Sequence, residues 1–197
     1  MSLALKEVIR IGEQMLADAG VADAAIDAKE LYCYMEGLDR TGLMMAWQRI
    51  LQDNQCEAYF KLVEERASRV PLQHITGTQE FMGLPFTVNE NVLIPRADTE
   101  TLAEAAEKII AERKNTTAPV RFLLDVCTGS GCIGISIAKR TGVPALLCDI
   151  SPEAVSVAEK NIQLNGVGGL CMCRQGDLFE AALPFAKERA SGFDIIT

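Results

Sequence analysis

Residues 123–139, LLDVCTGSGCIGISIAK, decide the fold, because they read as a buried strand, a glycine-rich turn and a helix in direct succession. Gly129, Gly131 and Gly134 form a G-x-G-x-x-G pattern, and an acid, Asp149, follows 20 residues after the first glycine. This pattern is typical of the first unit of a parallel nucleotide-binding sheet. Taken literally, it predicts a site for a nicotinamide dinucleotide.

Strand and helix patterns alternate on both sides of the glycine-rich turn. The segments are, in order, a strand at 120–126, a helix at 131–142, a strand at 145–150, a helix at 152–165, a strand at 170–175 and the start of a strand at 192–197. Ser151 is the expected cap of the second helix, with Pro152 in its first turn. Apolar strands that alternate with helices indicate a parallel, doubly wound α/β sheet. Since the pattern stops within the fourth strand, we expect an incomplete sheet with an open edge.

The first 70 residues predict a small helical bundle. Apolar residues recur at helical spacing over residues 2–20, 23–35, 42–47 and 53–68, and Ser2 is the expected cap of the first helix. Each helix has an apolar face, so the faces are expected to pack on one another. Met44, Met45 and Trp47 are predicted to lie in this core rather than in a cofactor box, with a surface that grips a macromolecule as the alternative.

Between these two regions the pattern changes. Residues 71–97 contain β-forming residues interrupted by the sequence Gly83-Leu84-Pro85, which predicts a β-hairpin linker. A helix is expected over residues 98–114, capped by Asp98. The residues expected on its apolar face are Leu102, Ala105, Ala106 and Ile109. The chain is therefore divided into a helical domain at 1–70, a linker at 71–97 and a partial sheet domain at 98–197.

Composition restricts the function and the compartment. The chain has 197 residues, of which 49% are hydrophobic, and no apolar run is long enough to span a membrane. The N-terminus lacks the layout of a signal peptide, so a cytoplasmic location is expected. The net charge is −8, and the first 70 residues carry half of it, with 8 basic and 12 acidic groups. Since neither part has a surplus of basic groups, direct nucleic-acid binding is not expected.

The cysteines and the single histidine do not form a recognisable metal site. Cys33, Cys56, Cys127, Cys132, Cys148, Cys171 and Cys173 are odd in number and lie in apolar segments. We expect reduced and mostly buried thiols, as is usual inside cells. No second group of cysteine or histidine residues accompanies the Cys171-x-Cys173 pair, so no metal site is predicted. His74 is expected to be structural.

An acid just before the glycines argues against a dinucleotide. Asp125 ends the first strand, where its charge would repel a pyrophosphate. The same carboxylate could orient an ammonium group, directly or through water, while the loop receives a carboxylate. S-adenosylmethionine has this zwitterionic end and carries no phosphate. The loop with Asp125 therefore favours a class I methyltransferase over a dehydrogenase.

Two further strand ends are expected to complete the nucleoside site. Asp149 is predicted to accept hydrogen bonds from ribose hydroxyls, with a pure capping role as its alternative. Asp177 is predicted to accept from an adenine amino group, and a helix-capping role is equally compatible with the sequence. Leu178 is predicted to cover the adenine ring.

Longer motifs carry a resemblance to a known family. The segments PLQHITGTQEFMGLPFTVNENVLIPRADTETL, LLDVCTGSGCIGISIA, CDISPEAVSVAEKN and GDLF make the chain similar to the glutamine methyltransferases that modify peptide-chain release factors. The hairpin followed by LIPR-x-DTE is the specific part, since other methyltransferases share only the glycine loop. The resemblance covers essentially the whole chain.

The resemblance implies a fold, a reaction and a set of site residues. It implies a helical substrate-recognition domain, a hairpin and a Rossmann-like domain that transfers methyl from S-adenosylmethionine. The acceptor would be the side-chain amide nitrogen of the glutamine in a Gly-Gly-Gln motif of a release factor. Arg96 would lie near the acceptor. The implied cofactor contacts are Cys127, Thr128, Gly129, Ser130, Gly131, Asp149 and Leu178.

The chain departs from the family pattern at four places. Cys127 stands where the pattern has a first glycine, Ala97 replaces a proline, and Leu178 replaces a frequent aromatic residue. The acceptor motif, Asn-Pro-Pro-Tyr, would follow FDIIT and is not in the sequence, so its catalytic residues would lie beyond Thr197. Those groups hold the weakly nucleophilic amide in line with the methyl group. We therefore expect the 197-residue chain to transfer little or no methyl.

Two other readings stay open besides the dehydrogenase. One is a methyltransferase that acts on a nucleobase amino group, which the acidic composition disfavours. The other is a non-catalytic interaction fragment with a partial nucleoside-binding sheet. Under any of these readings, the open sheet edge and the uncovered apolar helix faces predict self-association, strand exchange or disorder near the C-terminus.

Overall fold

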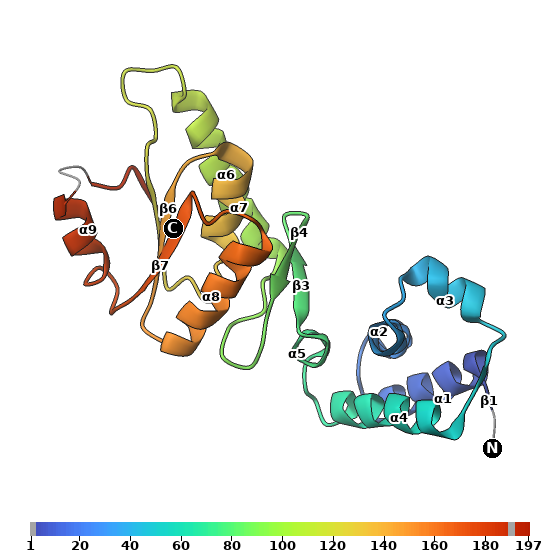
Figure 1. The fold of residues 1–197 in the computed structure, drawn as a ribbon. Helices are drawn as coiled ribbons and strands as arrows, with labels where there is room; N and C mark the ends of the chain where they lie inside the picture. The colour runs from blue at the N-terminus through green and yellow to red at the C-terminus, as the bar shows by residue number, and fades with distance from the viewer. Residues whose placement is uncertain (1–2, 189–191) are drawn as a thin grey trace. The chain divides into compact units, whose positions relative to one another are not determined.

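The chain folds into two compact units. The computed structural model describes residues 3–188 and 192–197, and the units are Met1–Thr76 and Gly77–Thr197 (Figure 1). The segment at 71–97 is divided between them, with a short helix in the first unit and the hairpin in the second. None of the described helices is long and apolar enough to cross a membrane.

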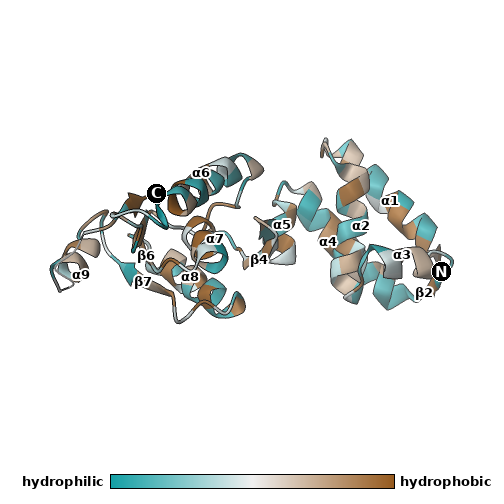
Figure 2. Ribbon diagram, turned by 90° about the horizontal axis from the view of Figure 1, so that it is seen from above, coloured by the Kyte–Doolittle hydropathy of each residue, from teal (hydrophilic) through white to brown (hydrophobic). Residues whose placement is uncertain are grey.

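The first unit confirms the predicted helical N-terminus. Its helices are α1 (Leu5–Asp18), α2 (Ala24–Glu36), α3 (Arg40–Ala46), α4 (Asp53–Ala67) and α5 (Leu72–Thr76). The expected face of α1 is buried, from Leu5 to Leu16. Figure 2 shows hydrophobic and hydrophilic bands alternating along these helices, as packing through one face requires. A short antiparallel pair that the sequence did not predict joins β1 (Leu3–Ala4) to β2 (Ile50–Leu51), and the predicted Ser2 cap lies outside the described residues.

The prediction that Met44 and Met45 lie in the core is wrong. Their side chains are 77% and 85% exposed, whereas Trp47 is half-buried. The reason is the shortness of α3, which has seven residues and buries one face through Leu43. Two adjacent methionines next to Leu43 then necessarily point elsewhere.

The second unit begins with the predicted β-hairpin. Strands β3 (Thr78–Phe81) and β4 (Leu84–Thr87) pair antiparallel, with Phe81 opposite Leu84. The two turn residues, Met82 and Gly83, have φ angles of 54° and 75°, which suit a tight two-residue turn. Phe81 and Phe86 point into the core of the second unit, so the hairpin is part of that core.

The helix after the hairpin is rotated relative to the prediction. Helix α6 (Ala97–Arg113) has Arg96 at its N-cap position without a side-chain cap, and Asp98 lies in the first turn instead of capping the helix. The buried residues are Ala103, Ala106 and Ile110, while Leu102 and Ile109 are exposed. Alanines let α6 lie close to α7, so contact with the neighbouring helix outweighs the larger side chains one position away.

The sheet confirms the predicted α/β class. Strands β5 (Leu123–Val126), β6 (Ala145–Asp149), β7 (Cys171–Gln175) and β8 (Ile195–Ile196) are all parallel, in the order β7-β6-β5-β8. The connecting helices are α7 (Cys132–Thr141), α8 (Pro152–Leu164) and α9 (Ala182–Glu188). Ser151 caps α8 by accepting from the Ala154 amide at 3.1 Å, as predicted.

The strands alternate between two apolar layers. Leu123 and Leu147 face the layer formed by α6, α7, α8 and the hairpin. Leu124 and Leu146 face the opposite layer, where α9 contributes Phe185. Helices on both faces bury most positions of β5 and β6, which explains why these two strands are mainly apolar.

Asn161 ties the hairpin to the sheet. This side chain is fully buried on α8, and its Oδ1 accepts from the Thr87 amide at 2.7 Å. Its Nδ2 donates to the carbonyls of Thr87 at 2.9 Å and Ser130 at 2.8 Å. One amide thus joins β4, α8 and the glycine-rich turn, and it satisfies backbone groups that have no other strand beside them.

The variant Asn161→Ala is expected to lower the free energy of unfolding by about 2–4 kcal/mol, because it leaves buried backbone groups unpaired. Urea denaturation followed by circular dichroism measures the change. Gln163→Ala, at an exposed position on the same helix, is the matched control and is expected to change stability by less than about 0.5 kcal/mol. Equal effects of the two substitutions would contradict the role given to Asn161.

Candidate functional site

The candidate site lies at the carboxyl end of β5. From β5 the chain adds β6 and β7 on one side and then places β8 on the other, so the strand order reverses next to β5. Parallel sheets bind their ligands outside the carboxyl ends of the strands at such a reversal. The glycine-rich turn, residues 127–131, links β5 to the start of α7 at this point. We call it the glycine loop.

A buried carboxylate lies beneath the glycine loop. Asp125 is 1% exposed, and its Oδ2 accepts from the Thr128 hydroxyl at 2.6 Å and the Gly134 amide at 3.0 Å. Its Oδ1 accepts from the Thr197 hydroxyl at 3.1 Å. Asp125 therefore joins β5, the loop, α7 and β8. This environment makes Asp125 a positioning residue for the loop, and a direct contact with a ligand ammonium is not available to it in this structure.

Burial changes the acidity of this group. Desolvation raises the pKa of Asp125, against the opposing effect of the hydrogen bonds from Thr128, Gly134 and Thr197. The nearby charge of Asp149 raises the pKa further. Asp125 adds a carboxylate beneath the loop to the one that Asp149 provides, and this additional acidic group disfavours a diphosphate ligand.

The loop depends on left-handed backbone conformations. The φ angles of Cys127, Gly129 and Gly131 are 56°, 55° and 81°. A Cβ atom at Gly131 would lie 2.7 Å from the Ile135 side chain, whereas at Gly129 it would meet nothing within 4 Å. Gly129 therefore leaves open space over its backbone, and Gly131 is needed for packing as well as conformation. Gly134 permits the predicted close packing, since its Cβ would lie 3.0 Å from Asp125 Oδ2.

Cys127 is the strained member of the loop. It is exposed and has a φ angle that L-residues other than glycine rarely adopt. The loop therefore keeps its shape despite the non-glycine residue, and the side chain projects into solvent. Thr128 and Ser130 are buried, and both backbone groups of Thr128 are already paired, its amide with the Cys148 carbonyl at 3.0 Å and its carbonyl with the Gly131 amide at 2.8 Å.

Asp149 fastens the loop from the neighbouring strand. Its Oδ2 accepts from the Gly129 amide at 2.9 Å, and its Oδ1 accepts from the Ser151 amide at 3.0 Å. The carboxylate is half-buried at the end of β6. It supports both the loop and the turn into α8, while Ser151 supplies the cap of that helix.

The residues after β7 give the site an exposed apolar edge. Asp177 is exposed, and its carboxylate makes no hydrogen bond to another described residue. Leu178 is 52% exposed and has a φ angle of 45°. Phe179, which the sequence analysis did not select, is 48% exposed beside it. The sequence contained the signal, since GDLF places an aromatic residue one position after Leu178.

Arg96 is exposed at the start of α6. Among residues 3–188 and 192–197, no group of three histidine, cysteine or acidic side chains is arranged to hold a metal ion. Burial raises the pKa values of Cys132 and Cys148 to about 11, so both thiols are neutral near pH 7. Thr197, which binds Asp125, was not predicted because nothing in its local sequence indicates the partner.

Two protein families match parts of this chain. The profile described as the PrmC N-terminal domain matches residues 7–77. The profile described as ribosomal protein L11 methyltransferase (PrmA) matches residues 101–190. The two matches correspond to the helical unit and to the sheet with its connecting helices.

Curated relatives match the chain across both units. A protein of Clostridium acetobutylicum named release factor glutamine methyltransferase is 39% identical over 171 residues, covering 86% of this chain and 57% of the relative. A protein of Geobacter sulfurreducens with the same name is 36% identical over 193 residues, covering 98% of this chain and 63% of the relative. The chain thus spans about three fifths of the length of these relatives.

Solved structures resemble part of the chain. The S-adenosylmethionine-dependent methyltransferase from Agrobacterium tumefaciens has a TM-score of 0.46 and 17% identity, covering 60% of this chain and 37% of that one. An RNA methyltransferase from Salinibacter ruber in complex with S-adenosyl-L-homocysteine has a TM-score of 0.37 and 28% identity, covering 45% and 53%.

The variant Cys127→Gly is expected to raise the free energy of unfolding by about 1 kcal/mol, because glycine adopts the left-handed conformation without steric cost. Thermal and urea denaturation measure the gain. Cys127→Ala is the matched control, since it removes the thiol and keeps the Cβ atom, and no gain is expected from it. A similar gain in both variants would assign the effect to the thiol.

The variant Asp125→Asn is expected to change the pH dependence of stability. In the folded protein the pKa of Asp125 is raised above its ordinary value of 3.8, so the folded state binds the proton more tightly than the unfolded chain. The stabilisation from the protonated carboxyl is complete below that ordinary value and is lost as pH rises through the raised one. Urea denaturation from pH 4 to 7 should show the wild type losing stability relative to Asp125→Asn. A difference that does not vary with pH would contradict the raised pKa.

Proposed function

Since this chain belongs to the release factor glutamine methyltransferase family, we propose that its second unit binds S-adenosylmethionine for methylation of a release-factor glutamine. The acceptor would be the side-chain amide nitrogen of the glutamine in a Gly-Gly-Gln motif. The observation that carries the proposal is the glycine loop held between Asp125 and Asp149 at the strand reversal.

The residues present fit this cofactor. Gly129 leaves open space above the loop backbone, so the carboxylate of an amino acid can approach the loop and the start of α7. Asp149 is a suitable acceptor for ribose hydroxyls at the end of β6. Leu178 and Phe179 supply exposed apolar surface for an adenine ring, and Asp177 supplies an acceptor for its amino group.

Each of these residues has a separate proposed role in methyl transfer. When bound, S-adenosylmethionine supplies a methyl group on a cationic sulfur. The loop would hold the amino-acid end of the cofactor and Asp149 would hold its ribose, while Asp125 keeps the loop in place from below. Arg96 is proposed to lie on the side of the protein substrate. The in-line orientation of the glutamine nitrogen is assigned to an Asn-Pro-Pro-Tyr motif, which is not among these 197 residues.

Two alternatives have less support. A dehydrogenase would bind a diphosphate, and the carboxylate of Asp125 directly beneath the loop opposes that ligand. A nucleobase methyltransferase would bring its site to a polyanion, which the net charge of −8 disfavours.

Isothermal titration calorimetry with S-adenosylmethionine and with NAD tests the cofactor. We expect binding of the first and none of the second. Asp149→Ala should weaken the binding of S-adenosylhomocysteine by about tenfold or more, since it removes an acceptor for the ribose. Against the 3′-deoxy analogue the wild type and Asp149→Ala should differ less, because the analogue lacks one hydroxyl. Glu159→Gln, an exposed charge change on α8, is the matched control.

Mass spectrometry of a release factor incubated with the chain and S-adenosylmethionine tests the reaction. We expect little methylation of the Gly-Gly-Gln glutamine by the 197-residue chain, and methylation once an Asn-Pro-Pro-Tyr segment is joined to it. Robust methylation by the chain itself would show that this motif is dispensable. Binding of NAD in place of S-adenosylmethionine would refute the proposed function.

A further inference from the structure

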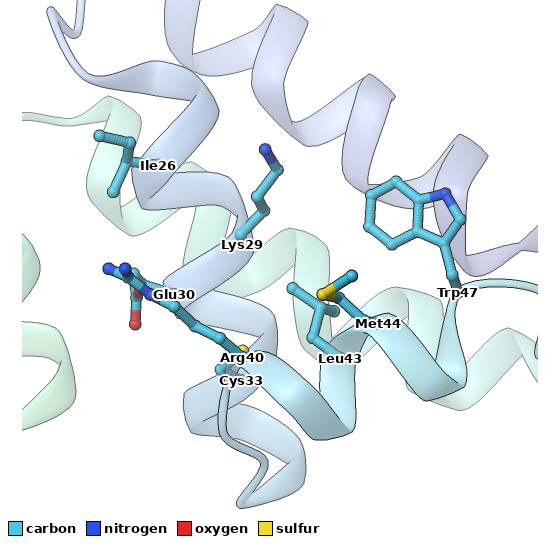
Figure 3. A pocket seen from close by; sticks show the side chains of 8 residues that line it. All are labelled: Ile26, Lys29, Glu30, Cys33, Arg40, Leu43, Met44 and Trp47. Atoms are coloured by element: carbon cyan, nitrogen blue, oxygen red, sulfur yellow. The ribbon is translucent and has the colours of Figure 1, made fainter.

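The first unit has an apolar groove that the cofactor site does not use. Helices α2 and α3 border it, and its volume is about 580 Å³, within the range of ligand-binding clefts (Figure 3). Cys33 and Leu43 are buried and form its floor. The exposed side chains of Ile26 and Met44 and the indole of Trp47 form its walls. We call it the α2–α3 groove.

The lining residues follow helical spacing on both helices. Residues 26, 29, 30 and 33 come from α2, and residues 40, 43, 44 and 47 come from α3 and its C-terminal cap. Each set is one stripe at i, i+3, i+4 and i+7. The other face of α2 is already buried in the bundle through Ala28 and Leu31. The groove therefore offers two neighbouring stripes, the surface on which a third helix packs.

Exposed apolar side chains line this groove. Met44 and Ile26 leave large apolar side chains in water, although the bundle core has already formed without them. A flexible methionine adapts to the side chains of a partner, which is why methionines are frequent on surfaces that bind helices. An exposed apolar groove with a polar rim is typical of a protein-binding site.

The charges of the groove specify the partner further. Glu30 pairs with Arg40 at 3.2 Å, and Lys29 makes no ion pair with any of the described residues. The lining therefore carries a net charge of +1 on a chain whose net charge is −8. An acidic segment is attracted to this place and repelled by most of the remaining surface.

We propose that the α2–α3 groove docks an amphipathic helix of the protein substrate, with apolar residues at i, i+3/i+4 and i+7 and an acidic residue facing Lys29. This inference rests on the proposed function for the nature of the substrate, a release factor. Docking occurs on the first unit and leaves the cofactor loop in the second unit unchanged.

Trp47 makes the groove directly observable, because it is the only tryptophan of the chain and lines the groove. Titration of the full chain with a purified bacterial release factor that lacks tryptophan through substitution should change the fluorescence of Trp47. Met44→Asp is expected to weaken this binding by about tenfold or more, because it places a charge in the apolar contact. Met45→Asp is the matched control, since Met45 is equally exposed on the same helix and does not line the groove.

A charge reversal tests the acidic partner. Lys29→Glu should weaken binding about tenfold, and the affinity of the wild type should fall as salt increases. Circular dichroism and calorimetry with S-adenosylmethionine on the same samples show whether each variant is folded and whether the second unit binds its cofactor. These readouts separate failure of the groove from failure of the proposed function.

Three results would overturn the proposal. The first is that the release factor binds wild type and Met44→Asp with equal affinity, which would leave the cofactor function untouched. The second is that the wild-type chain binds no release factor even though it binds S-adenosylmethionine. The third is that Met44→Asp abolishes only self-association in light scattering, which would assign the groove to a second copy of the chain.

Discussion

The organisation of the second unit depends on one buried carboxylate. Asp125 is removed from water, and each of its hydrogen bonds reaches a different part of the chain: the loop through Thr128, the helix through Gly134 and the neighbouring strand through Thr197. A buried charge is costly unless such partners surround it. The order of the strands and the shape of the loop are therefore linked at one point.

A second polar residue links the hairpin to the same place. Asn161 binds both backbone groups of Thr87 and also the Ser130 carbonyl in the loop. The Asn161 side chain supplies the two backbone hydrogen bonds to Thr87 that a neighbouring strand would supply in a sheet. The hairpin is thus connected through hydrogen bonds to the loop proposed to hold the cofactor.

The sequence was most informative where its pattern repeats and least informative where contacts are distant. Alternation of strands and helices predicted the parallel sheet, and Ser151 was recognisable as a cap from its immediate neighbours. The face of α6 was missed because the contact with α7 selects small residues, which hydrophobicity does not reveal. Thr197 and Asn161 were missed for a related reason, since their partners lie far away in the sequence. Met44 was misplaced because an apolar side chain in a short helix has no periodic pattern to orient it.

The hydrogen bond between Asp149 and Gly129 has a consequence for the energetics of the proposed site. Both carboxylate oxygens of Asp149, the proposed acceptor for a ribose hydroxyl, already accept backbone amides, from Gly129 and from Ser151. A ribose hydroxyl that binds Asp149 therefore either replaces one of these backbone amides or shares a carboxylate oxygen with it. It does not bind to a carboxylate that lacks partners. The loop is kept in order by the same residue that would recognise the nucleoside, so little ordering entropy is left to lose on binding. A loop that is ordered before binding therefore favours a higher affinity for the cofactor, since the ligand does not have to order it.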